Sequence, residues 1–242
     1  MGGKQVNKQN FSGQITSGVK SQASVLSIIT FVCEQLPFWR DDPNRLAVVS
    51  EDKLNSQLYK FLNSQAREHL PMFLFGYEEP QYIRRNVDIS VLPTENMIIE
   101  ARPYTIYDPV LVIECKRLPA PSVDREKEYV TGTSPDKITG GIQRFKLGFH
   151  GAKHELAAMV GYIQEQFDKD WRNTINGWIK ELIAKPIGDG CVWADDEILY
   201  LLENNTATGI TKCNSKHRRI ANNRKIEIHH IWISMRKNMR NS

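Results

Sequence analysis

The sequence predicts an α/β fold in which a mixed central β-sheet is flanked by α-helices. Two strand-like runs predict the sheet. Val110–Ile113 is apolar at every position, which is typical of a strand buried on both faces. Residues 84–92 instead alternate apolar and polar side chains. With 242 residues, 40% hydrophobic and 25% charged, the chain is long and apolar enough to bury a sizeable core as a single domain.

The N-terminal third predicts a loose segment followed by two helices. Residues 1–20 are rich in Gly, Ser, Gln and Asn and are expected to be flexible, so the single domain spans 21–242. Val25–Leu36 is an apolar run of helix length that ends near Pro37, and we expect it to dock on the core. Ser50 is a good N-cap for the next helix. That helix carries an apolar stripe formed by Leu54, Leu58, Phe61 and Leu62.

The remaining elements complete a core over residues 50–165. Strands are expected near 81–92, 96–101 and 109–117, then a loop or short helix over 123–133, a helix over 137–149 and a strand over 156–163. Residues 166–242 form a C-terminal extension with a helix over 167–184 and a strand over 226–233. The core order is therefore helix, three strands, helix, strand.

Charged residues at the end of the buried strand are the strongest functional signal. Glu114 and Lys116 lie two residues apart, so their side chains project from the same side of the strand. Asp88 lies on the preceding strand, on the face opposite to Val87 and Ile89. Asp88 and Glu114 are suitable ligands for Mg²⁺ or Mn²⁺, which would lower the pKa of a bound water. Lys116, with a depressed pKa, would orient or deprotonate that water. The alternative is a solvated strand end with a surface ion pair.

These residues resemble the PD-(D/E)XK nuclease superfamily. Val87-Asp88 corresponds to the first half-motif and Glu114-Cys115-Lys116 to the second. The resemblance implies a restriction-endonuclease-like core in αβββαβ order, with Asp88 and Glu114 as metal ligands and Lys116 as a catalytic residue. Valine precedes Asp88 where the family commonly has proline. The gap of 26 residues between Asp88 and Glu114 requires an extended hairpin.

The same resemblance adds two residues to the site. Gln143 corresponds to the glutamine that several branches carry on the following helix, where it would orient the water or a substrate phosphate. Glu51 corresponds to an acidic residue on the preceding helix and is a further candidate metal ligand. The alternative for Glu51 is a first-turn acid stabilised by the helix dipole.

Basic residues are unevenly distributed, although the net charge is only +4. From Lys216 to the last residue the chain holds eight Lys and Arg against a single acid, Glu227. Such a cluster either contacts phosphates or is a solvated tail. The candidate nucleic-acid contacts are Arg144, Lys146, Arg218, Arg219 and Lys225. Gly140 and Gly141 either permit close approach of a phosphate backbone or ease a turn.

The leading hypothesis is a metal-dependent nuclease, with DNA favoured over RNA as the substrate. By resemblance, a role in prokaryotic defence or restriction is expected. A second hypothesis is an inactive nucleic-acid-binding or assembly subunit that keeps the fold, and a third is a hydrolase of small phosphoesters. Cutting both strands would require a homodimer, and a regulatory protein partner is the other expected interaction.

The sequence also predicts what the protein lacks. No apolar run reaches the length of a membrane span and no signal peptide is recognised, so we expect a cytoplasmic protein without membrane contact. The four cysteines show no C-x-x-C spacing, which argues against a zinc site or a disulfide framework. Cys115 is expected to be a small core residue rather than a nucleophile.

Overall fold

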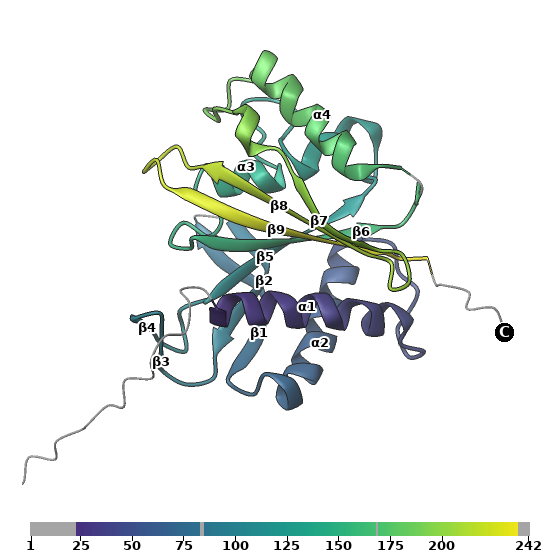
Figure 1. The fold of residues 1–242 in the computed structure, drawn as a ribbon, viewed down its shortest axis with the longest axis vertical. Helices are drawn as coiled ribbons and strands as arrows, with labels where there is room; N and C mark the ends of the chain where they lie inside the picture. The colour runs from purple at the N-terminus through teal and green to yellow at the C-terminus, as the bar shows by residue number, and fades with distance from the viewer. Residues whose placement is uncertain (1–22, 83–84, 168, 237–242) are drawn as a thin grey trace, which may run out of the picture.

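A seven-stranded mixed β-sheet forms the centre of the molecule, with helices on both faces (Figure 1). The computed structural model describes residues 23–82, 85–167 and 169–236. The predicted α/β class with flanking helices is therefore confirmed. The segment 1–20, predicted to be loose, lies outside the described residues. None of the helices in the described ranges is long and apolar enough to cross a membrane.

The strands of the main sheet lie in the order β1-β2-β5-β6-β9-β8-β7. The pairs β5–β6 and β6–β9 are parallel, and the other neighbours are antiparallel. The strands are β1 (Phe73–Tyr82), β2 (Arg85–Pro93), β5 (Leu111–Leu118), β6 (Leu156–Ile163), β7 (Tyr200–Asn205), β8 (Ile210–Arg218) and β9 (Lys225–Ser234). A separate two-stranded arm pairs β3 (Met97–Ile99) with β4 (Arg102–Tyr104).

Two hydrophobic clusters hold the helices to the two faces of the sheet (Figure 1). The first cluster joins one face to α1 (Ala23–Asp41) and α2 (Glu51–His69). The second joins the other face to the short helix η1 (Val123–Tyr129), α3 (Gly141–Lys146) and α4 (Trp171–Ala184). The expected stripe on α2 is confirmed for its leucines, which are fully buried at 54, 58 and 62. The short helix η2 (Asp195–Glu197) precedes β7.

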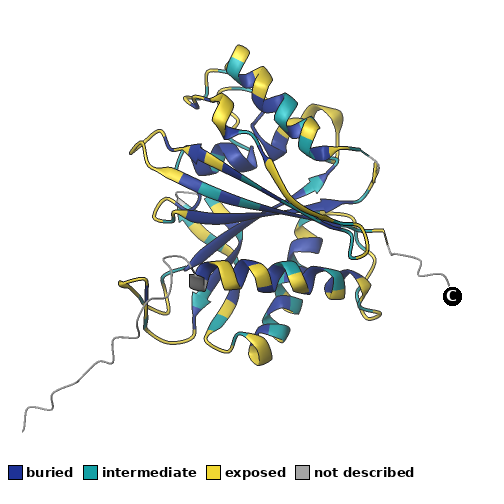
Figure 2. Cartoon of the chain, in the orientation of Figure 1, coloured by how far each residue is buried: buried dark blue, intermediate teal, exposed yellow. Residues whose placement is uncertain are grey.

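Burial along the strands explains why β5 and β6 are central. Every residue of β6 is buried, as are the first six residues of β5, because helices cover both faces of the sheet there (Figure 2). Strand β7 is exposed along five of its six residues, which is typical of an edge strand. Cys115 is fully buried in the first cluster, as expected for a core residue.

The structure differs from the prediction at the first strands. Strand β1 was expected only at its last residues, because Gly76 and Pro80 interrupt its pattern. Pro80 is tolerated because β1 is an edge strand, where a missing N–H need not leave a ladder bond unmade. The strand expected at 96–101 belongs to the arm and not to the main sheet. The β3–β4 arm is the hairpin that fills the long gap between Asp88 and Glu114.

The C-terminal strands continue the central sheet. The strand predicted at 226–233 is β9, which pairs parallel to β6 across eight residues. β7 and β8 were not expected, because their sequences carry many polar residues. The first helix also runs past Pro37 to Asp41. Arg40 stabilises that last turn by donating hydrogen bonds to the carbonyls of Thr208 and Ser234, at 2.8 and 3.2 Å.

Candidate functional site

Asp88 and Glu114 meet where β2 and β5 run antiparallel. Ile89 lies opposite Ile113, so Asp88 and Glu114 follow as the next residues on the other face of the sheet. The Asp88 carboxylate accepts a hydrogen bond from the backbone N–H of Cys115 at 2.7 Å. The sequence prediction that these two acids lie close together therefore agrees with the fold.

Glu114 is fully buried and surrounded by positive groups. Its Oε1 lies 3.0 Å from Lys116 Nζ and 2.8 Å from Arg144 Nη1. Its Oε2 lies 3.1 Å from His150 Nδ1 but receives no hydrogen bond of good geometry. Burial alone would raise the pKa of Glu114, but Lys116, His150 and Arg144 together hold that pKa well below its ordinary range. Glu114 is therefore an ionised carboxylate whose Oε2 is buried beside His150 and lacks a hydrogen bond of good geometry.

The pKa of Asp88 is shifted in the opposite direction to that of Glu114. Burial, followed by the charge of Glu114, raises the pKa of Asp88 well above its ordinary value. Among the described residues, no ion pair forms at Asp88. Two neighbouring carboxyl groups with pKa values displaced in opposite directions are a frequent feature of functional sites.

Lys116 links strand β5 to helix α2. Its ammonium lies 3.0 Å from Glu114 and 3.1 Å from Glu51, which is the first residue of α2. Burial favours the neutral amine, but Glu114, Glu51 and Asp88 outweigh it and hold the pKa of Lys116 above its ordinary range. The expectation of a depressed pKa is corrected, because the three neighbouring carboxylates favour the protonated ammonium.

Glu51 connects α2 to the end of β5. One oxygen pairs with Lys116, and the other accepts a hydrogen bond from the backbone N–H of Arg117 at 3.0 Å. Ser50 occupies the N-cap position but its side chain makes no capping hydrogen bond. Glu51 is thus more than a first-turn acid, because its two oxygens orient Lys116 and fix the strand end.

Gln143 does not join this cluster. Its amide oxygen accepts hydrogen bonds from the N–H groups of Gly132 and Gly140, both at 3.0 Å, and its amide nitrogen donates to Asp189 at 2.5 Å. These contacts hold the loop before α3. The next residue, Arg144, reaches Glu114 instead.

Gly140 and Gly141, at the start of α3, lie against other parts of the protein. A Cβ added at Gly140 would lie 2.2 Å from the Cα of Thr131, and one at Gly141 would lie 2.5 Å from the Cε of Met159. Gly140 therefore packs too closely on the backbone of Thr131 to carry a side chain, whereas at Gly141 the nearest atom is the end of a flexible methionine.

His150 was not anticipated from the sequence. It lies in the loop after α3, is fully buried, and packs edge-on against Phe145 with ring centroids 5.8 Å apart. A lone histidine in a loop carries no periodic or spacing signal. Only the return of this loop to β5 brings it to Glu114.

Two of the predicted nucleic-acid contacts are corrected. Lys146 is fully buried, pairs with Glu197 at 2.5 Å and lies 4.8 Å from the centre of the Trp193 ring. Arg219 is only 3% exposed and donates to the carbonyls of Gly151 and His154. Neither side chain is on the surface, because each satisfies a polar group inside the fold.

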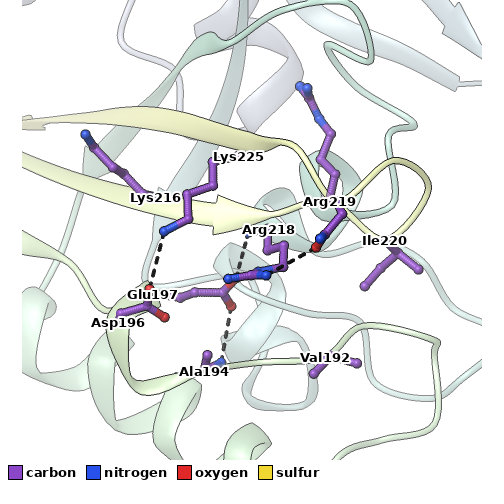
Figure 3. A pocket seen from close by; sticks show the side chains of 10 residues that line it. Val192, Ala194, Asp196, Glu197, Lys216, Arg218, Arg219, Ile220 and Lys225 are labelled. Atoms are coloured by element: carbon purple, nitrogen blue, oxygen red, sulfur yellow. Dashed lines mark hydrogen bonds and ion pairs between the residues drawn. The ribbon is translucent and has the colours of Figure 1, made fainter.

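The other basic residues remain accessible. Arg144 is partly exposed, with 18% of its side chain reaching solvent. Arg218 and Lys225 are exposed beside a cavity of about 350 Å³, shown in Figure 3 with Val192 and Ile220. Lys225 lies 3.6 Å from Asp196 across this cavity. Phosphate contact at Arg218 and Lys225 remains a prediction.

The carboxylates of Asp88 and Glu114 are the type of ligand that a divalent cation such as Mg²⁺ takes. No group of three His, Cys, Asp or Glu side chains in the described ranges is arranged to hold a metal. Mg²⁺ needs only one or two carboxylates, because it keeps several waters. Within the described ranges Asp88 forms no ion pair, and Oε2 of Glu114 is buried beside His150 without a hydrogen bond, so these are the oxygens that would have to serve as ligands.

Comparisons with known proteins leave the chain without an assigned family. No protein-family model, no curated protein and no solved structure matches it.

Proposed function

We propose that this protein hydrolyses phosphodiester bonds with a divalent metal ion, in the manner of PD-(D/E)XK nucleases. The observation that carries the proposal is the pairing of Asp88 with Glu114 on β2 and β5, with Lys116 held beside them. The order α2, β1, β2, β5, α3, β6 supports a restriction-endonuclease-like core. DNA is the expected substrate, and defence or restriction the expected setting.

The residues have distinct roles in this proposal. Asp88 and Glu114 would hold Mg²⁺ or Mn²⁺, which when bound activates a water and offsets charge on the phosphate. Lys116 remains protonated, so it stabilises negative charge that develops on the phosphate. Glu51 positions Lys116, and Arg144 offers a partly exposed guanidinium beside the same carboxylate.

Cleavage and metal binding test this function together. Plasmid DNA and RNA are incubated with Mg²⁺, Mn²⁺ or EDTA, and Mn²⁺ binding is measured by electron paramagnetic resonance. We expect Glu114→Gln and Lys116→Met to reduce cleavage by about 100-fold or more, and Glu114→Gln to abolish Mn²⁺ binding. Glu203→Gln is the matched control, since Glu203 is an exposed glutamate that pairs with Lys212 far from the site in sequence. Cleavage that persists in Glu114→Gln would place the chemistry elsewhere.

An inactive binding or assembly subunit is the second candidate. The complete burial of Glu114 and its contacts with three basic side chains favour it, since a carboxylate so surrounded is also a stable structural element. This candidate predicts nucleic-acid binding that survives Glu114→Gln, with no metal-dependent cutting in any variant.

A further inference from the structure

A second cavity, rich in arginine, lies beside the β3–β4 arm. Its volume is about 300 Å³, and its walls come from the arm, the loop before β6 and the turn between β8 and β9. The basic lining residues are Arg102, Lys153, Arg219 and Arg224, against two acids, Glu100 and Glu155. This Arg219 cavity carries an excess of positive charge that the Glu114 cluster does not use.

Arg219 is a buried cation without a counter-ion. Its side chain is 3% exposed, and within the described ranges no carboxylate lies at ion-pair distance from it. Burying an unpaired charge costs several kcal/mol, so such a group is expected to have an anionic partner. Glu155 is near enough to influence Arg219 electrostatically but forms no ion pair with it.

The guanidinium of Arg219 is already oriented. Its Nη2 donates to the carbonyls of Gly151 and His154, while its Nε has no hydrogen-bond partner. Its Nε is buried, so the two N–H groups of Nη1 are the donors left for a ligand. A guanidinium fixed in this way offers these donors and its positive charge to a phosphate or carboxylate.

Arg102 fixes the opposite wall of the cavity. It donates to the carbonyl of Lys153 at 2.9 Å and lies 5.0 Å from the centre of the Tyr104 ring. The arm is thereby tied to the same loop that Arg219 holds. Burial, and then the charges of Arg102 and Arg219, lower the pKa of His154 to about 4, so this neighbour adds no positive charge near neutral pH.

We infer that the Arg219 cavity binds a small phosphate-bearing molecule of about mononucleotide size. The arginines would take the phosphate, and the apolar side chains of Ile99, Val110 and Leu156 would contact the remainder of the ligand. A volume of about 300 Å³ is at the lower end of the range of small-molecule sites. The inference does not depend on the proposed nuclease activity.

Titration calorimetry on the full chain tests the inference, with inorganic phosphate, pyrophosphate and AMP as probes. We expect AMP and pyrophosphate to bind, and Arg219→Lys and Arg102→Gln each to weaken binding by about tenfold or more. Arg218→Gln is the control, because Arg218 lines only the cavity of Figure 3, whereas Arg219 lines both cavities. Arg102 and Arg224 are exposed, so Arg102→Gln and Arg224→Gln keep the test valid if Arg219→Lys does not fold.

Three outcomes would overturn the inference. The first is that none of the three probes binds the wild-type chain. The second is that binding is unchanged in both Arg102→Gln and Arg219→Lys, or is lost equally in Arg218→Gln. The third is that an oligonucleotide binds through these arginines while AMP and pyrophosphate do not, which would make the surface a nucleic-acid contact.

Discussion

Two buried glutamates, Glu114 and Glu197, both pair with a lysine, yet their surroundings differ. Lys146 contacts both oxygens of Glu197, at 2.6 and 2.5 Å, and the backbone N–H of Arg218 adds a third bond at 2.7 Å. Burial alone would raise the pKa of Glu197, but His217, Lys146 and the Arg218 N–H lower it to about 2. Every oxygen of Glu197 is thus used inside the fold.

Glu114 instead has a second carboxylate beside it. Three basic side chains surround Glu114, and Asp88 lies next to it with a raised pKa and, in the part of the chain that the structure describes, no ion pair. A buried ion pair by itself is therefore no sign of a functional site. The additional acid is what makes the Glu114 cluster a candidate site.

The largest effect on stability is expected at the Glu197–Lys146 pair. Glu197→Ala leaves Lys146 as a buried charge without a partner, which should lower the free energy of unfolding by about 3–5 kcal/mol. Urea denaturation followed by circular dichroism measures this loss. The double variant Lys146→Met, Glu197→Gln should recover part of it, because no charge is then stranded. A loss below about 1 kcal/mol in Glu197→Ala would show that the Glu197–Lys146 pair does not stabilise the fold, and the contrast with Glu114 would then fail.

A smaller loss is expected at the candidate site. In Glu114→Gln, Lys116 keeps Glu51 at 3.1 Å and Arg144 can turn toward solvent. The free energy of unfolding should therefore fall by about 1–3 kcal/mol, as for a lost hydrogen-bond partner of charged groups. The same denaturation experiment ranks the two glutamates. A loss in Glu114→Gln as large as in Glu197→Ala would show that both pairs are structural.

Buried histidines with lowered pKa values, His154 and His230 among them, should make the protein sensitive to acid. His230 is fully buried between Tyr129 and Ser215, at 2.8 and 2.7 Å, and burial lowers its pKa well below 6.5. The unfolded chain then binds more protons than the folded one, so stability is lost as pH falls below 6.5. The loss between pH 7 and 5.5 is about 1.2 kcal/mol for such a histidine. His230→Gln should reduce the fall in melting temperature over this range, and an unchanged fall would contradict the assignment.

The smallest effect is expected at Asp88, where a substitution should increase stability. Because the folded pKa of Asp88 is raised, the folded state holds its proton more tightly, and Asp88 reduces stability at pH values above its ordinary pKa. Asp88→Asn should therefore stabilise the protein by about 1 kcal/mol at pH 8, while Mn²⁺ binding is lost. Melting temperature and paramagnetic resonance measure the two effects. A clear loss of stability would mean that Asp88 is a structural acid.

The sequence could predict the faces on which side chains lie. Alternation along a strand places Asp88 away from Ile89, and Glu114 on the same side as Lys116, whatever surrounds them. The apolar content of residues 110–113 and the leucine stripe of α2 likewise fixed which surfaces had to be buried. These are local properties, because each depends only on residues a few positions apart.

Tertiary structure decided which groups those side chains meet. Glu51 reaches Lys116 across 65 residues, and Arg144 and His150 reach Glu114 across 30 and 36. On α3 two basic residues have different environments: Arg144 is partly exposed at the candidate site, whereas Lys146 is buried against Glu197. No local pattern separates the two, because the pairing of a charge depends on how distant segments pack, and packing is set by the whole sheet.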